Sequence, residues 1–165
     1  MLIALVCILI FFLLYLLYLI VCWNWSKTCQ PYYNPNQPLL IGHRGSPTKI
    51  TENTIASFQK ALEEGADGIE FDVRLSKDKQ IVVFHDKDLK RLSNRSDLVE
   101  SLSLAELQTV ELKKKEGQAE EVYIPSLNEM VPLLAQAQVV NIEIKSSSLF
   151  QGHNILNPLI EFLDK

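Results

Sequence analysis

The stretch DGIEFDVRL, residues 67–75, decides the fold class and raises the question of function. Successive side chains of a β-strand point to opposite faces of the sheet. The apolar residues of this stretch therefore share one face, and Glu70, Asp72 and Arg74 share the other. The pattern predicts a strand that packs one face into a core and presents two acids and a base on the opposite face.

A second stretch, VVNIEIKS at residues 139–146, repeats the pattern with Glu143 and Lys145 on the charged face. Burying an unpaired carboxylate is very costly, so three acids aimed at one interior require a cation or a water-filled cleft. Oxygen ligands suit a hard divalent cation, Mg²⁺ or Ca²⁺, and we expect Glu70, Asp72 and Glu143 to bind it. The alternative is a solvent-exposed sheet face. Because sheets in α/β proteins are covered on both faces, the cation is favoured.

Strands and helices alternate along the remainder of the chain. LLIGHRG (39–45) predicts a strand that ends in a glycine turn, and NTIASFQKALEEG (53–65) predicts a helix capped by Asn53. Further elements are predicted in the same way: strands at 80–86 and 139–145, helices with capping boxes at Ser103/Glu106 and Ser126/Glu129, the second kinked or shortened by Pro132, and a helix at 155–165. This alternation indicates an α/β fold with a parallel sheet.

The N-terminus is uncharged and apolar. Residues 2–22, LIALVCILIFFLLYLLYLIVC, make about 30 Å of helix, which matches the hydrocarbon core of a bilayer. A cleaved signal peptide is the competing interpretation, but the segment lacks an early Lys or Arg and is too long. We therefore predict a transmembrane anchor over residues 1–25 and a single-pass membrane protein. Lys27 alone weakly favours a cytoplasmic C-terminal domain, so the side of the bilayer stays open.

A Pro-rich linker is predicted at 26–38, between the anchor and a domain at 39–165. The chain carries 16 basic and 20 acidic residues, a net charge of −4. The sequence shows no basic stripe and its net charge is negative, so no nucleic-acid partner is expected.

Two histidines end predicted strands, His43 in Gly-His-Arg-Gly and His85 in Phe-His-Asp. A lone histidine at a strand end is more often a structural hydrogen-bonding residue. Here, however, both histidines, the acids, Arg44 and Lys145 converge on the strand ends where α/β folds place their chemistry. Imidazoles suit general acid and base roles, and basic groups beside a divalent cation suit an anionic substrate. The residues thus indicate metal-assisted phosphoester chemistry.

The segment from Leu39 to Lys145 closely resembles the glycerophosphodiester phosphodiesterases. The ordered set HRG, ENT, ExD, HD and ExK carries the resemblance, with IPSLNEM between the last two. It implies a TIM-barrel enzyme that uses a divalent cation, Mg²⁺ or Ca²⁺, to hydrolyse glycerophosphodiesters to sn-glycerol 3-phosphate and an alcohol. The apolar N-terminus is similar to that of membrane-bound members, some of which act on lysophospholipids as lysophospholipases D.

The resemblance also implies roles for individual residues. The metal carboxylates of the family fall on Glu70, Asp72 and Glu143, and its paired catalytic histidines fall on His43 and His85, with metal contact as an alternative for His85. The positions that contact phosphate or support the site fall on Arg44, Lys145 and Glu52.

The chain departs from the family at its end. A TIM barrel takes about 250 residues and eight strands, whereas about four strands are predicted before Lys165. The expectation is the N-terminal half of a barrel that requires its C-terminal half for closure. Two hypotheses follow: the N-terminal portion of a membrane-anchored phosphodiesterase, or a catalytically inactive truncated membrane protein or interaction subunit derived from the family.

Overall fold

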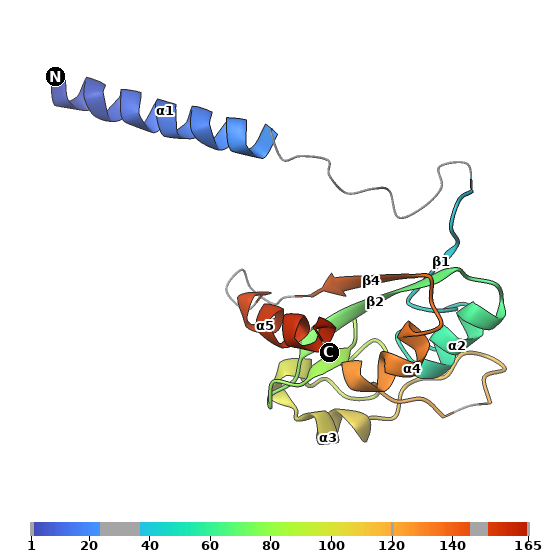
Figure 1. Cartoon of the computed structure of the whole chain (residues 1–165). Coiled ribbons are helices and arrows are strands. Elements are labelled where there is room, and N and C mark those ends of the chain that lie inside the picture. The colour runs from blue at the N-terminus through green and yellow to red at the C-terminus, as the bar shows by residue number, and fades with distance from the viewer. Residues whose placement is uncertain (1, 24–36, 120, 146–151, 165) are drawn as a thin grey trace. The chain divides into compact units, whose positions relative to one another are not determined.

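The computed structural model describes residues 2–23, 37–119, 121–145 and 152–164 (Figure 1). The chain divides into two compact units, residues 1–38 and residues 39–165. Most of the predicted linker at 26–38 lies outside the described residues.

The first unit contains one helix, α1 (Leu2–Trp23), with exposed apolar side chains. Among the described residues, no helix has both the length and the apolar character needed to cross a membrane. The prediction of a single-pass membrane anchor at 1–25, with the bilayer as partner, is therefore wrong.

The second unit is organised around strand β2 (Gly68–Leu75). Strands β1 (Ile41–His43) and β4 (Val139–Ile144) pair with it in parallel, on opposite edges, because residues 68–70 pair with both. The short strand β3 (Ile81–Val83) pairs antiparallel with the end of β2, beyond β1 on the same edge. The predicted α/β fold is confirmed in the described residues, and the predicted parallel pairing holds for β1, β2 and β4. The sheet is mixed, because β3 is an antiparallel hairpin partner of β2.

The register of the parallel strands sets which residues of the site lie opposite one another. In β1–β2, His43 is opposite Glu70, and in β2–β4, Asp72 is opposite Glu143. A Cβ on Gly68 would lie 2.4 Å from the carbonyl oxygen of Val139, so only glycine allows β4 to approach β2 this closely at its start.

The apolar face of β2 packs on helices α2 (Ile55–Glu63), α4 (Val131–Leu134) and α5 (Gly152–Leu163), which lie along one side of the sheet (Figure 1). Phe58 of α2 meets Phe71 of β2 edge to face, with ring centroids 5.9 Å apart. The cluster is a core of fully or almost fully buried side chains: Phe58, Ile69, Phe71, Val73, Ile81, Val83, Leu127, Met130, Leu133, Ile155 and Leu159.

A second apolar cluster lies under the long connection between β3 and β4. It includes Phe84, Leu89, Leu107 and Ile124, and the connection carries helices η1 (Val99–Ser101), α3 (Leu104–Gln108) and η2 (Leu127–Met130). This packing orders the segment that begins with His85.

The predicted caps are confirmed with one exception. Ser103/Glu106 and Ser126/Glu129 both form capping boxes. Pro132 lies in the first turn of α4, and the predicted helix is divided there into the 3-10 helix η2 and the short helix α4.

The exception is Asn53, which was predicted to cap α2. Thr54 is the actual N-cap, because its hydroxyl accepts from the Ser57 backbone N–H. Asn53 instead adopts φ 56° and turns its side chain toward Asp72.

Candidate metal and phosphate site

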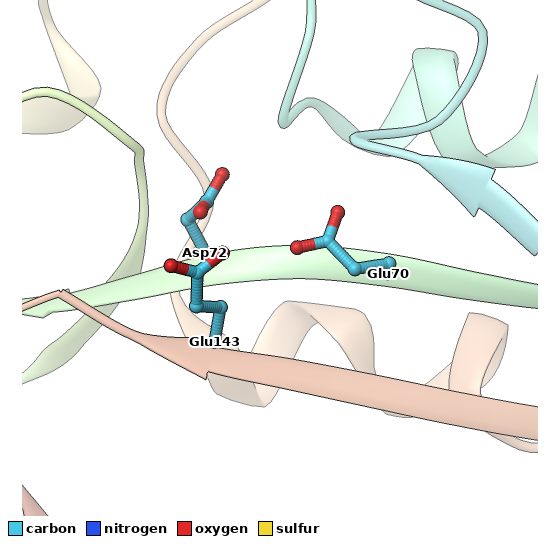
Figure 2. A group of neighbouring side chains, drawn as sticks. All are labelled: Glu70, Asp72 and Glu143. Carbon is cyan, nitrogen blue, oxygen red and sulfur yellow. The ribbon is translucent and has the colours of Figure 1, made fainter.

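Glu70 and Asp72 of β2 converge with Glu143, which lies near the end of β4 (Figure 2). Each offers a carboxylate oxygen, and these oxygens lie within 4.8 Å of one another. The strand period places the first two on one face of β2, and the β2–β4 register brings the third beside Asp72. The three predicted carboxylates are therefore close enough to one another to bind a single cation.

The burial of these acids distinguishes a cation site from a solvent-exposed sheet face. Glu70 is 6% exposed and Asp72 is fully buried, so the charged face of β2 is covered and the exposed-sheet alternative is wrong for this strand. Glu143 on the edge strand β4 is about half exposed. Burial, followed by the charge of Asp72, raises the pKa of Glu70.

Asp72 is the most enclosed of the three. Its Oδ2 accepts from Asn53 Nδ2 at 2.8 Å. Its Oδ1 has no hydrogen-bond partner among the described residues, although Lys145 Nζ lies 3.2 Å away. A buried carboxylate oxygen that lacks a hydrogen bond and faces two further acids fits a hard divalent cation, which takes oxygen ligands.

The turn after β1 supplies the basic side of the site. Arg44 adopts φ 58°, and its backbone N–H donates to the carbonyl oxygen and to the Oε2 of Glu70, at 2.9 and 3.1 Å. Its Nη1 donates to Glu52 Oε1 at 3.0 Å. Its Nε lies 3.1 Å from Asp72 Oδ2, but the angles exclude a hydrogen bond, so we treat this contact as an ion pair only.

Lys145 completes the basic groups at the end of β4. Its ammonium pairs with both Glu143 and Asp72. Burial opposes its charge, but the hydrogen bond to Glu143 and the ion pair with Asp72 outweigh burial and raise the pKa of Lys145. The ammonium therefore stays protonated across the neutral range.

The two histidines differ in how they are held. His43 is 66% exposed, and its Nε2 lies 3.7 Å from Glu70 Oε2. His85, just beyond β3, has its Nδ1 2.7 Å from Asp86 Oδ1, and Arg74 Nε donates to the His85 carbonyl oxygen at 2.8 Å.

A second ion-pair network lies beside these groups and was not predicted from the sequence. Arg91 donates through Nη1 and Nη2 to the two oxygens of Glu52, at 2.9 and 2.7 Å, and through Nε to Asp86 Oδ2 at 2.6 Å. The Arg91 hydrogen bond is the largest cause that lowers the pKa of Glu52. Burial raises the pKa of Asp86, but hydrogen bonds from Arg91 and His85 outweigh it and lower the pKa overall.

Residues 43–151, well over half of the chain, match the model of the Glycerophosphoryl diester phosphodiesterase family. The chain belongs to this family. The predicted resemblance is thereby confirmed.

Curated relatives agree with this assignment. A glycerophosphodiester phosphodiesterase of Caldanaerobacter subterraneus subsp. tengcongensis is 44% identical over 111 residues, which cover 66% of this chain and 45% of the relative. One from Bacillus altitudinis is 38% identical over 118 residues. The chain thus spans about half the length of the curated relatives that it matches.

Solved structures of the family share the fold. An Oleispira antarctica phosphodiesterase, solved in complex with the product sn-glycerol-3-phosphate, matches with a TM-score of 0.70 and 32% identity, over 78% of this chain and 52% of that one. The Thermotoga maritima glycerophosphodiester phosphodiesterase matches with a TM-score of 0.60 and 34% identity, over 76% and 50%. The second unit therefore has the TIM-barrel-like glycerophosphodiester phosphodiesterase fold.

The structure brings most of the predicted site residues of this family member into contact. Pairwise contacts link seven of them: Glu70, Asp72, Glu143, Arg44, Lys145, Glu52 and His43. His85 joins them through Asp86, Arg91 and Glu52. Asp86 follows His85 directly in the sequence and could have been found as a histidine partner, and Asn53 lies in the ENT motif, whereas Arg91 carries no such signal.

Proposed function

We propose that this chain carries the divalent-cation site and the phosphate-binding groups of a glycerophosphodiester phosphodiesterase. The observation that carries the proposal is the approach of Glu70, Asp72 and Glu143 to within 4.8 Å, with an unbonded buried oxygen on Asp72. These three carboxylates would hold Mg²⁺ or Ca²⁺. When bound, the cation supplies Lewis-acid polarisation of a phosphoryl oxygen.

The substrate class follows from the family and from the solved relative. The Oleispira antarctica structure holds sn-glycerol-3-phosphate, the product of that enzyme. We infer a glycerophosphodiester substrate for this chain, with residues 39–165 as the N-terminal part of the barrel domain. A lysophospholipid shares the same glycerol phosphodiester and is the second substrate to test.

The basic residues of the chain have defined tasks in this scheme. Arg44 and Lys145 bind the anionic phosphodiester and offset the charge that grows on its oxygens in the transition state. Glu52 orients the Arg44 guanidinium and so supports substrate binding indirectly. Both basic groups already lie against the carboxylates, so a phosphate and a cation together would balance the charges of the site.

The histidines move protons. Asp86 has a lowered pKa and is an ionised acceptor, so the proton of neutral His85 lies on Nδ1 and Nε2 carries the lone pair. One histidine takes a proton from the substrate 2-hydroxyl or from water as that oxygen attacks phosphorus. The other gives a proton to the departing alkoxide as its P–O bond breaks. The assignment of His43 and His85 to these two roles, with metal contact by His85 as the alternative, is open to mutational test.

The direct test is hydrolysis of glycerophosphocholine by the 165-residue chain, with Mg²⁺ or Ca²⁺ and then with EDTA. We expect turnover with the cation and its loss in chelator; undiminished turnover in EDTA contradicts the metal site. A parallel assay on lysophosphatidylcholine in detergent micelles distinguishes the two substrates.

A cation-binding family member without turnover is the second candidate. The half exposure of Glu143 favours it. Calorimetric Mg²⁺ binding with no hydrolysis of either substrate would support this candidate over the enzyme.

A further inference from the structure

Arg91 belongs to none of the predicted motifs, yet its guanidinium connects the two sides of the site. Two of its nitrogens bind both oxygens of Glu52, and the third binds Asp86. Glu52 in turn binds Arg44, in the turn after β1, and Asp86 binds His85, in the segment after β3. One side chain thus joins two segments that approach the carboxylate cluster separately.

The chemistry of the contacts makes this connection specific. A bidentate arginine–carboxylate pair fixes both planes, and the remaining Nε–H fixes the direction of the Asp86 carboxylate. Because Asp86 Oδ2 is occupied by Arg91, its Oδ1 faces His85 Nδ1. An ammonium on a flexible stem cannot make these three contacts in one plane, so lysine is a poor substitute.

We propose that Arg91 is a positioning residue that sets the orientation and tautomer of His85 through Asp86 and holds Arg44 through Glu52. This inference rests on the proposed function for its kinetic consequences, whereas the state of the His85 ring can be read without turnover. Arg91 is itself about half exposed, so its removal leaves the core clusters of the domain intact.

The kinetic test compares Arg91→Ala, Arg91→Lys and Asp86→Asn with wild type on glycerophosphocholine. We expect each variant to lower kcat by at least about tenfold. Arg91→Ala combined with Asp86→Asn should cost little more than the worse single variant, because the two residues act through one chain of contacts. Arg91→Lys with wild-type kcat would overturn the proposal, since it would reduce the role of Arg91 to its charge.

Arg95→Ala is the matched control. Arg95 lies four residues further along the same segment and pairs through Nε with Asp97 at 2.9 Å, with a similar exposure of about 40%. The Arg95→Ala substitution removes the same charge from the same loop as Arg91→Ala, and we expect its kcat to stay within about twofold of wild type. An equal loss of activity in Arg95→Ala and Arg91→Ala would show that loop charge alone matters, and would overturn the proposal.

The structural readout is ¹⁵N NMR of the His85 imidazole, assigned with His85→Ala. In wild type we expect a protonated Nδ1 and an unprotonated Nε2 at a pH where the ring is neutral. In Arg91→Ala and Arg91→Lys we expect a mixture of tautomers. An unchanged single tautomer in both variants overturns the inference. A wild-type chain without hydrolysis contradicts the proposed function alone, because this readout still tests Arg91.

Discussion

The turn after β1 and the segment after β3 each bring a histidine to the site, but they hold it in different ways. His43 is largely exposed, and its nearest charged partner is Glu70 at 3.7 Å. His85 is held by Asp86 through Nδ1 and by Arg74 through its backbone carbonyl.

The difference follows from what surrounds each segment. The β1 turn is fixed through its backbone, because the Arg44 N–H binds Glu70 and Arg44 takes a positive φ, so the neighbouring His43 ring is left free. The segment after β3 lies over its own apolar cluster, which provides a platform for a side-chain network. The His85 imidazole is therefore held by neighbouring side chains, whereas the His43 imidazole is open to solvent.

The largest expected effect is the loss of either histidine. Under the proposed function, His43→Ala and His85→Ala should each lower kcat for glycerophosphocholine by at least about 100-fold. Because His43 is open to solvent, added imidazole should restore more activity to His43→Ala than to His85→Ala. Steady-state assays at increasing imidazole concentration measure the difference, and equal rescue of both variants contradicts the comparison.

The next largest effect is on Mg²⁺ binding by the carboxylates. Asp72 is enclosed and Glu143 is open to solvent, as His85 and His43 are among the histidines. Asp72→Asn should weaken Mg²⁺ binding by at least about tenfold, and Glu143→Gln should weaken it less, because Glu143 is half exposed and already paired with Lys145. Calorimetric titration of the folded variants measures both affinities, with the surface variant Glu111→Gln as control. A greater loss of Mg²⁺ affinity in Glu143→Gln than in Asp72→Asn would contradict this prediction, because the stronger ligand would then lie on the edge strand β4.

The sequence was enough to predict which residues share a face of a strand, but not which residues of other segments they contact. A period of two was enough to place Glu70 and Asp72 together, and the parallel α/β alternation was enough to bring β4 next to them. The pairing of Asp72 with Glu143 depends on the register of two strands separated by more than sixty residues. That register, with the close approach of β4 at Gly68, exists only in the folded chain.

Three outcomes show where local sequence signals fail. Asn53 looked like a cap, but Thr54 supplies the hydroxyl, and the left-handed backbone of Asn53 aims its amide at Asp72. Arg91 reaches Glu52 across thirty-nine positions, a contact with no local pattern. The apolar N-terminal run predicted a membrane span, and the described part of α1 does not satisfy that criterion.

The smallest expected effect tests Glu52, which touches both sides of the comparison through Arg44 and Arg91. Hydrogen bonding from Arg91 lowers its pKa from the ordinary value of 4.5. A carboxyl with a lowered folded pKa contributes stability that is complete above the unfolded value and is lost as the pH falls through the folded value. Glu52→Gln should therefore lower the free energy of unfolding by about 1 kcal/mol at pH 7.

Urea unfolding of wild type and Glu52→Gln between pH 7 and pH 3 measures this contribution. The difference between the two proteins should be constant above about pH 5.5 and shrink below about pH 4.5, because the wild-type carboxyl then takes up protons more readily when the chain is unfolded. Glu111→Gln on the surface controls for the loss of one charge. A difference that grows as the pH falls would mean that Glu52 is strained by its surroundings rather than stabilised by the two arginines, and the link between the histidine-bearing segments would then have to run through Asp86 alone.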